Sequence, residues 1–291
     1  MPRSRRASRG CNATMRDWPR GAGTVDTEAV SRLIVQVAAE EIMPRYAKLA
    51  AGDVREKGPG DLVTIADEAA EHRLTPALIQ LLPGSVVVGE EAAAADPSVI
   101  DRLDGSDPVW VIDPVDGTAN FAAAKGDFGV MVSLIQGGRT LAAWIYDPRH
   151  EHMARAELGG GAWLDGMRMQ VAAAPADPAA LRGALLTGSF GDREVALRVN
   201  QRRDRVQAVK SLRCAAAEYV RLADGSMHFA LFSKLMPWDH AAGVLLHGEA
   251  GGYSAYLDGG RYAPARLDAP ALMLAPDEAS WQELYQRLVA P

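Results

Sequence analysis

The chain has 291 residues and a net charge of −6 at pH 7, and hydrophobic and charged residues make up 48% and 23% of it. This composition is ordinary for a globular protein, and the negative charge argues against nucleic acid as a partner. The longest apolar runs fall well short of the roughly 18 residues that a membrane-spanning helix needs, so we expect no membrane span.

The cysteines and the N-terminal segment bear on location. Cys11 and Cys214 lack a C-x-x-C spacing and so support neither a disulfide scaffold nor a thiolate metal site, which favours a reducing cytoplasm. Residues 1–24 are rich in Arg and Ser and lack apolar periodicity, so they predict a disordered basic tail, or a true start of translation at Met15. A targeting or nucleic-acid role for this tail stays open, although it lacks the apolar core of a secretory signal.

The first half of the chain predicts two helices and a hairpin-rich sheet. Apolar residues recur at helical spacing over 26–50, with Asp26 or Thr27 as the cap and Pro44 as the end or kink. A Gly/Pro turn at 56–61 then leads into a short strand and a second helix within 62–83. Short strands are expected at 85–89 and 109–112, and Gly-Gly and Asp-Gly pairs predict hairpins within 128–148 and 152–173.

The second half predicts a mixed α/β layer. Short strands within 184–189, 207–212 and 271–276 alternate with helices at 191–203, 214–224, 240–250 and 277–290. We therefore divide the chain into a basic tail (1–24), an α+β half that carries the acidic motifs (25–175) and an α/β half (176–291).

Acidic residues stand beside apolar segments at four places. Strand ends lie at the rim of an open α/β sheet, where such folds bind ligands, and Asp239 precedes a predicted helix that it would cap. Burying several carboxylates together is costly, so either some stay protonated or a divalent cation neutralises them; oxygen ligands suit Mg²⁺ or Mn²⁺. The acids are Asp67, Glu90, Glu91, Asp113, Asp116 and Asp239.

The stretch after Asp116 predicts a phosphate site. Gly117-Thr118-Ala119-Asn120 would open a short helix whose free N–H groups point toward the acids, and helix N-termini bind phosphate. Metal ligands, a phosphate cradle and the Thr118 hydroxyl together suggest metal-assisted hydrolysis of a phosphate ester.

These motifs resemble those of the inositol monophosphatase-like family of Mg²⁺-dependent, lithium-sensitive sugar and nucleotide phosphatases. The likeness spans about residues 25–290 and implies the layered αβαβα sandwich of the inositol monophosphatase and fructose bisphosphatase type, commonly a homodimer. The matching stretches are Gly89-Glu90-Glu91, Asp113-Pro114-Val115-Asp116-Gly117-Thr118-Ala119-Asn120-Phe121, Trp238-Asp239-His240-Ala241-Ala242-Gly243 and Glu249-Ala250-Gly251-Gly252.

The resemblance implies a metal ligand set. Glu90, Asp113 and the carbonyl of Val115 would hold one Mg²⁺, and Asp113, Asp116 and Asp239 a second. A weaker third ion would lie beside Asp67, with Glu90 reaching it through water. Mn²⁺ is a possible substitute.

The resemblance also implies catalytic and substrate residues. Thr118, paired with Asp67, would orient and deprotonate the attacking metal-bound water. The amides of Gly117 and Thr118 would hold phosphate oxygens, and Lys57 would lie near the third ion. The substrate would be a small phosphorylated polyol, sugar or nucleotide.

Two positions depart from the inositol-cleaving members. Phe232 stands where they carry a Glu that grips substrate hydroxyls, and Arg213 stands where many relatives have Gly. A phenyl ring accepts no such hydrogen bond, and Arg213 would pair with a second phosphate or carboxylate, or form a structural ion pair. Tyr219 and His240 are further candidates for the pocket wall, or for core packing. These departures suit a histidinol-phosphate or 3′-phosphoadenosine 5′-phosphate type phosphatase as an alternative, and a non-catalytic metal-binding regulatory protein is the alternative of another class.

Overall fold

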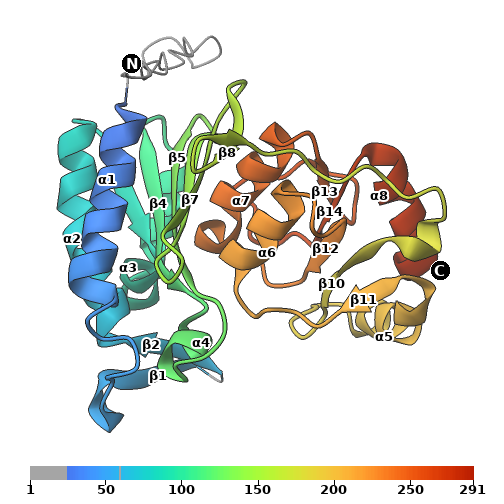
Figure 1. Ribbon diagram of the computed structural model, residues 1–291, viewed down its shortest axis with the longest axis horizontal. Helices are drawn as coiled ribbons and strands as arrows, with labels where there is room; N and C mark the ends of the chain where they lie inside the picture. The colour runs from blue at the N-terminus through green and yellow to red at the C-terminus, as the bar shows by residue number, and fades with distance from the viewer. Residues whose placement is uncertain (1–24, 59) are drawn as a thin grey trace, which may run out of the picture.

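The computed structural model describes residues 25–58 and 60–291 (Figure 1), so the predictions about the basic tail lie outside the described residues. The chain begins with α1 (Thr27–Val37), which a π-helical turn (Ala38–Ile42) continues. Asp26 caps α1 by accepting hydrogen bonds from the amides of Glu28 and Ala29, both at 3.0 Å, as the sequence predicts. The helix ends just before Pro44 because the proline ring clashes with the preceding turn.

A separate two-stranded hairpin follows. In it β1 (Val54–Gly58) pairs antiparallel with β2 (Asp61–Thr64), and β2 leads directly into α2 (Ile65–Leu81). The sequence predicts only a turn at 56–61, because charged and Gly/Pro residues hide the strand character of β1. Figure 1 shows the hairpin below α1 and α2, next to α4.

The larger sheet has seven strands in the order β3-β4-β5-β6-β7-β8-β9, and all pairs are antiparallel except β3 with β4. Helix α3 (Glu90–Ala95) and a 3₁₀ helix (Pro97–Asp104) lie between β3 and β4, and α4 (Thr118–Ala122) follows β4. The strands are β3 (Val86–Gly89), β4 (Val109–Asp116), β5 (Gly129–Gln136), β6 (Arg139–Asp147), β7 (His152–Glu157), β8 (Gly161–Leu164) and β9 (Met167–Arg168).

The smaller sheet has five strands in the order β11-β10-β12-β14-β13. Its strands are β10 (Arg182–Leu186), β11 (Gln207–Val209), β12 (Phe229–Phe232), β13 (Tyr253–Tyr256) and β14 (Leu272–Ala275). Its helices are α5 (Arg193–Gln201), α6 (Ala215–Ala223), α7 (Pro237–Glu249) and α8 (Glu278–Leu284), which a π-helical turn (Tyr285–Val289) extends. The sequence misses β12 and β13, because a strand of four residues is too short to show a readable period.

Alternation along β5 shows how the layers stack. Val130 and Val132 pack with α1 and α2 on one face of the large sheet, whereas Met131 packs with α6 and α7 on the other. The small sheet covers the other side of α6 and α7, and α5 and α8 cover its outer face (Figure 1). These five layers confirm the predicted αβαβα sandwich.

The division of the chain at residue 175 stays a prediction. Strand β9 of the large sheet ends at Arg168, and β10 of the small sheet begins at Arg182. Helices α6 and α7 from the second half nevertheless cover the large sheet of the first. Within the described residues no helix has the length and apolar character to span a membrane.

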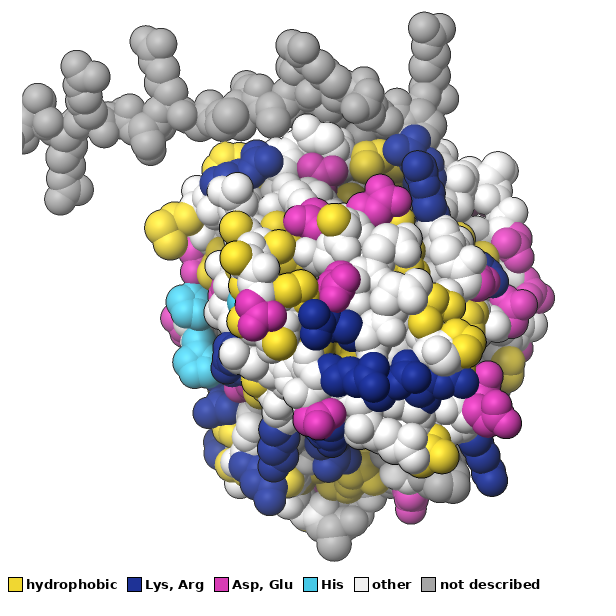
Figure 2. Space-filling model, turned by 90° about the vertical axis from the view of Figure 1, so that its right-hand side faces the viewer, with side chains coloured by type: hydrophobic (Ala, Val, Ile, Leu, Met, Phe, Trp, Pro, Cys, Tyr) yellow, Lys and Arg dark blue, Asp and Glu magenta, His cyan; other side chains and the backbone are white. Residues whose placement is uncertain are grey.

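The outer face of the second half is basic. Figure 2 shows Lys and Arg side chains in a row across this side of the molecule. Residues 193–213 carry seven Lys or Arg and two acids, so the net charge of −6 conceals a positive region. Three of these arginines donate to backbone carbonyls near the C-terminus; they are Arg198, Arg202 and Arg205.

Candidate metal centre

Three carboxylates meet where β4 ends and α7 begins. Asp113 and Asp116 on β4 and Asp239 on α7 each offer an oxygen that lies within 4.8 Å of the others. Burial, and then the nearby Glu90 carboxylate, raises the pKa of Asp113 and of Asp239 well above the usual range. Such a set of close, buried oxygen donors suits a hard divalent cation, which would neutralise the repulsion between them.

The structure places Asp239 inside α7 rather than before it. The prediction that Asp239 precedes and caps the helix is wrong, because α7 begins at Pro237 and Asp239 lies within its first turn. Pro237 occupies a position where its missing N–H costs no intrahelical bond, so the helix starts earlier than the apolar pattern indicates. The carboxylate is therefore free of a capping role and faces Asp113 and Asp116.

Asp116 is held from the start of α6. Its Oδ2 atom accepts hydrogen bonds from the Cys214 thiol at 3.0 Å and from the Ala216 amide at 2.7 Å. Burial raises the pKa of Asp116, while these donors oppose that shift. Cys214 was not foreseen as a site residue, since nothing in the sequence shows that it lies beside residue 116.

The turn after β4 places Thr118 beside Asp67. Gly117 has a φ of 83°, and a Cβ there would lie 2.8 Å from the Asp127 carbonyl oxygen, so only glycine fits. The Thr118 hydroxyl oxygen lies 2.9 Å from the Val115 carbonyl oxygen and 3.2 Å from Asp67 Oδ1. Because the hydroxyl has one proton, it donates to one of these acceptors at a time.

Asp67 also fixes the hairpin to α2. Its Oδ2 atom accepts hydrogen bonds from the Thr64 amide at 2.9 Å and the Thr64 hydroxyl at 2.6 Å, which forms a capping box at the start of α2. Asp67 is thus the third residue of the helix. Burial raises the pKa of Asp67 to about 6, against the opposing effect of these bonds.

Glu90 and Glu91 share a lysine. The Lys57 ammonium lies 2.7 Å from Glu90 Oε1 and 2.9 Å from Glu91 Oε1, so the hairpin reaches over to α3. Burial alone would lower the pKa of Lys57, but the two carboxylates outweigh it and raise that pKa. Burial raises the pKa of Glu91 to about 7, against the effect of Lys57.

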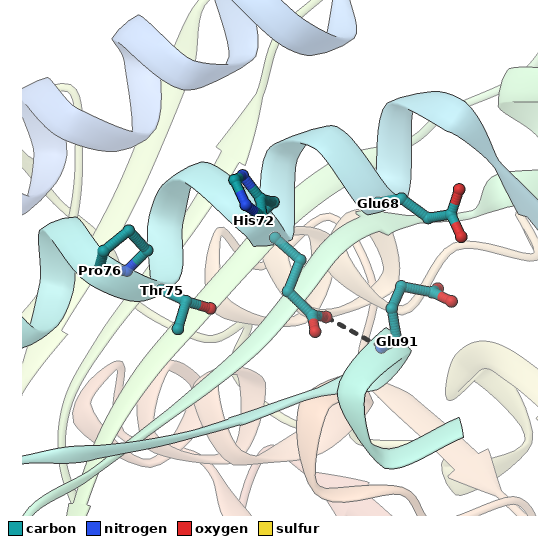
Figure 3. Close-up of a pocket in the computed structure, with 6 residues that line it drawn as sticks. Glu68, His72, Thr75, Pro76 and Glu91 are labelled. Carbon is teal, nitrogen blue, oxygen red and sulfur yellow. Dashed lines mark hydrogen bonds between the residues drawn. The ribbon is translucent and has the colours of Figure 1, made fainter. Parts of the chain in front are cut away.

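A further carboxylate positions α3 itself. Glu71 on α2 accepts hydrogen bonds from the amides of Glu91 at 2.9 Å and Ala92 at 2.8 Å, as Figure 3 shows for Glu91. A Cβ on Gly89 would lie 2.3 Å from the Glu71 carboxyl carbon, which explains the glycine before Glu90. A cavity of about 380 Å³ borders these groups but is not lined by Asp113, Asp116 or Asp239; its lining residues are Glu68, Glu71, His72, Thr75, Pro76 and Glu91.

The two residues that depart from the inositol-cleaving members, Phe232 and Arg213, differ in burial. Phe232 is only 3% exposed and stacks on Tyr219, with ring centroids 5.2 Å apart, while the Tyr219 hydroxyl lies 2.9 Å from His240 Nδ1. Phe232, Tyr219 and His240 therefore belong to one buried aromatic cluster. Arg213 is exposed and, among the described residues, has no side-chain ion pair.

Asn120 connects the turn after β4 to the segment before α6. Its Nδ2 atom donates to the Asp127 carbonyl at 2.7 Å and to the Leu212 carbonyl at 2.9 Å. The asparagine of the first-half motif is thereby bonded to the segment that carries Arg213 and Cys214. Arg213 itself has a φ of 56°, a conformation that glycine adopts at lower cost.

Nearly all of the described chain matches one family model. Residues 25–290 match the inositol monophosphatase family. The chain belongs to that family. Members of this family act on small phosphorylated substrates and are generally metal-dependent, in agreement with the carboxylate cluster.

Individual relatives carry several names. The chain is 34% identical to the inositol-1-monophosphatase of Mesorhizobium japonicum, over 70% of this chain and 76% of that protein. It is equally 34% identical to the Nus factor SuhB of Pseudomonas aeruginosa, over 74% of this chain and 79% of that protein. Among solved structures, the extragenic suppressor protein suhB from Bartonella henselae is 25% identical with a TM-score of 0.76, covering 89% of this chain and 98% of that one.

Proposed function

We propose that this protein is a Mg²⁺-dependent phosphomonoesterase that hydrolyses a small phosphorylated polyol, sugar or nucleotide. The observation that carries the proposal is the meeting of Asp113, Asp116 and Asp239 within 4.8 Å, next to the Thr118–Asp67 contact. Membership of a phosphatase family supports it.

The donor set indicates which residues would hold cations. Glu90, Asp113 and the Val115 carbonyl would hold one ion and Asp113, Asp116 and Asp239 a second, with Asp67 beside a third. Bound Mg²⁺ would act as a Lewis acid, lower the pKa of water and offset the negative charge of the phosphate. Mn²⁺ has a similar preference for oxygen ligands.

Thr118 and Asp67 supply the proton acceptor. With a pKa of about 6, Asp67 is largely ionised at neutral pH and accepts the Thr118 proton, which leaves the hydroxyl oxygen free to accept from an attacking water. We propose that this pair orients the water and removes its proton.

The proposed substrate residues surround the metal ligands. Gly117 and Thr118 amides would hold phosphate oxygens, and Lys57 would add positive charge beside Glu90. Arg213 is exposed next to Cys214 and would receive a second anionic group of the substrate. Phe232 packs against Tyr219 and would shape an apolar wall without hydrogen-bonding a hydroxyl.

A regulatory protein of the same fold is the second candidate. Two observations favour it: relatives named Nus factor SuhB, and the basic region of residues 193–213. It is the weaker candidate, because a protein that only binds has no need of the Thr118–Asp67 pair. We also propose a homodimer, which sedimentation equilibrium tests directly.

The test is phosphate release from a panel of phosphomonoesters, with Mg²⁺, with EDTA, and with Mg²⁺ plus Li⁺. The panel holds inositol 1-phosphate, fructose 1,6-bisphosphate, 3′-phosphoadenosine 5′-phosphate, histidinol phosphate and NADP. Asp116→Asn is expected to lower kcat/KM roughly a hundredfold or more, since a bound ion contributes several kcal/mol. Asp101→Asn, at an exposed acid outside the site, is the matched control. Near-normal turnover by Asp116→Asn would overturn the ligand assignment, and silence of the wild type on every ester would favour the regulatory candidate.

A further inference from the structure

Two exposed histidines stand side by side at the turn between β6 and β7. The His150 and His152 rings have centroids 6.3 Å apart and planes 16° from parallel. Their side chains are 53% and 57% exposed, whereas His240 and His247 are buried in α7. Neither ring takes part in the carboxylate cluster, so the proposed phosphatase function leaves this pair unexplained.

Each ring has one nitrogen fixed by a carboxylate. His150 Nδ1 lies 2.7 Å from Asp147 Oδ2, and His152 Nδ1 lies 2.7 Å from Asp165 Oδ2. A neutral imidazole donates from one nitrogen and accepts at the other, so each carboxylate holds the proton on Nδ1. The Nε2 lone pair of each ring is then available, and among the described residues neither Nε2 has a hydrogen-bond partner.

The two carboxylates are themselves fixed by the backbone. Asp147 Oδ1 accepts from the Arg149 amide at 2.9 Å, and Asp165 Oδ1 accepts from the Met153 amide at 2.8 Å. Both acids therefore present their second oxygen to a histidine in a set direction. A carboxylate that fixes the tautomer and raises the basicity of an imidazole is the usual outer partner of a metal-binding histidine.

We propose that His150 and His152 bind a divalent late transition-metal ion, of the class of Zn²⁺, Ni²⁺ or Cu²⁺, through their Nε2 atoms. Imidazole nitrogen suits these ions and not Mg²⁺, so this site and the carboxylate cluster would select different metals. With metal–nitrogen bonds of about 2 Å, two imidazoles on one tetrahedral ion have centroids about 5 Å apart, so the rings need to approach by about 1 Å. His150 lies on the turn and His152 is the first residue of β7, and both side chains are more than half exposed, which allows such a movement.

The ion would join two turns of the large sheet. His150 lies between β6 and β7, and Asp165, the partner of His152, lies between β8 and β9. Arg149 donates to the Gly126 carbonyl and lies over the Tyr46 ring at 5.9 Å, so the turn is already attached to the loop after α4. The site is therefore built on a supported turn.

The test is a calorimetric titration of the untagged full-length chain with Ni²⁺. Mg²⁺ is present in excess so that it occupies the carboxylate cluster. His150→Ala and His152→Ala are each expected to weaken Ni²⁺ binding by at least about tenfold, and Asp165→Asn by about tenfold, because partners of metal-binding histidines contribute that much to affinity. His72→Ala, at an exposed histidine on α2, is the matched control and is expected to change nothing.

A spectroscopic measurement identifies the ligands directly, so the test does not depend on the affinity alone. Cu²⁺ bound to the wild type is expected to show coupling to two imidazole nitrogens in electron paramagnetic resonance, and coupling to one in either histidine variant. Unchanged melting temperatures would show that the variants are folded. The absence of Ni²⁺ binding by the wild type, or equal binding by the wild type and a variant that carries both His150→Ala and His152→Ala, would overturn the proposal.

Discussion

Two regions that meet at the carboxylates are held in place by different forces. The acid frame, by which we mean β4 with α4 and the first turns of α3 and α7, is fixed by bonds to backbone groups, as at Glu71 and Asn120. Apart from the Thr64–Asp67 hydrogen bonds where β2 enters α2, the β1–β2 hairpin reaches its neighbours through ion pairs: Lys57 with Glu90 and Glu91, Arg55 with Glu68, and Lys234 with Asp61 at 3.7 Å. The acid frame should therefore keep its geometry whatever the cations present, whereas the position of the hairpin should depend on charge.

The first prediction tests the acid frame at Glu71. Glu71→Ala leaves the Glu91 and Ala92 amides without an acceptor and should lower the free energy of unfolding by about 4 kcal/mol, less if water enters from the adjacent cavity. Glu68→Ala, which removes an exposed ion pair with Arg55, should cost less than about 1 kcal/mol. Urea unfolding measures both, and equal losses would contradict the comparison.

The second prediction concerns Asp67, which joins the two regions. Its pKa is raised from 3.8 to about 6, so in the folded metal-free protein its contribution to stability is fully present below pH 4 and is lost as the pH rises through 6. That loss amounts to about 3 kcal/mol. Asp67→Asn should remove this part of the pH dependence when both proteins are unfolded in EDTA from pH 4 to 7. Parallel curves for variant and wild type would show that Asp67 does not titrate in this range.

The third prediction tests the hairpin. Lys57→Met leaves Glu90 and Glu91 without their cation and should destabilise the protein in EDTA by about 2 kcal/mol, between the values for exposed and buried ion pairs. Saturating Mg²⁺ should restore most of this loss, because it supplies positive charge to the same acids. Arg55→Met is the control and should respond weakly in either condition. A loss for Lys57→Met that Mg²⁺ leaves unchanged would contradict the account.

The fourth and smallest prediction returns to the acid frame, at Cys214. Cys214→Val removes the donor to Asp116 Oδ2 and should weaken Mg²⁺ binding about tenfold, because Asp116 loses one of its orienting bonds. Cys214→Ser keeps a donor and should stay close to the wild type. Calorimetric titration with Mg²⁺ separates the two, and equal weakening in both variants would show that the thiol acts by packing alone.

Much of the fold was predictable wherever an element is long enough to show a helical or alternating pattern of apolar residues. The helix over 26–50 and the hairpins of the large sheet have clear periods and turn residues, and α1, β5 and β6 lie where the pattern places them. Strands β1, β12 and β13 were missed, because each is four or five residues long and its identity depends on the strands it pairs with. The cap predicted for Asp239 was wrong because Pro237 starts α7 earlier.

The candidate site likewise contains some features that the sequence predicts and others that it does not show. The sequence itself determined the family and the acids that stand together in its motifs, since Asp113, Asp116 and Thr118 are neighbours in the chain and a turn keeps them together. Which distant groups orient them depends on how the folded chain packs. Cys214 lies 98 residues beyond Asp116 and Glu71 lies 20 before Glu91, and such contacts arise from the packing of α6 and α2 against the sheet ends. The same holds for the pairing of His152 with Asp165, because a hydrogen bond between the start of β7 and the turn after β8 has no period that a sequence can show.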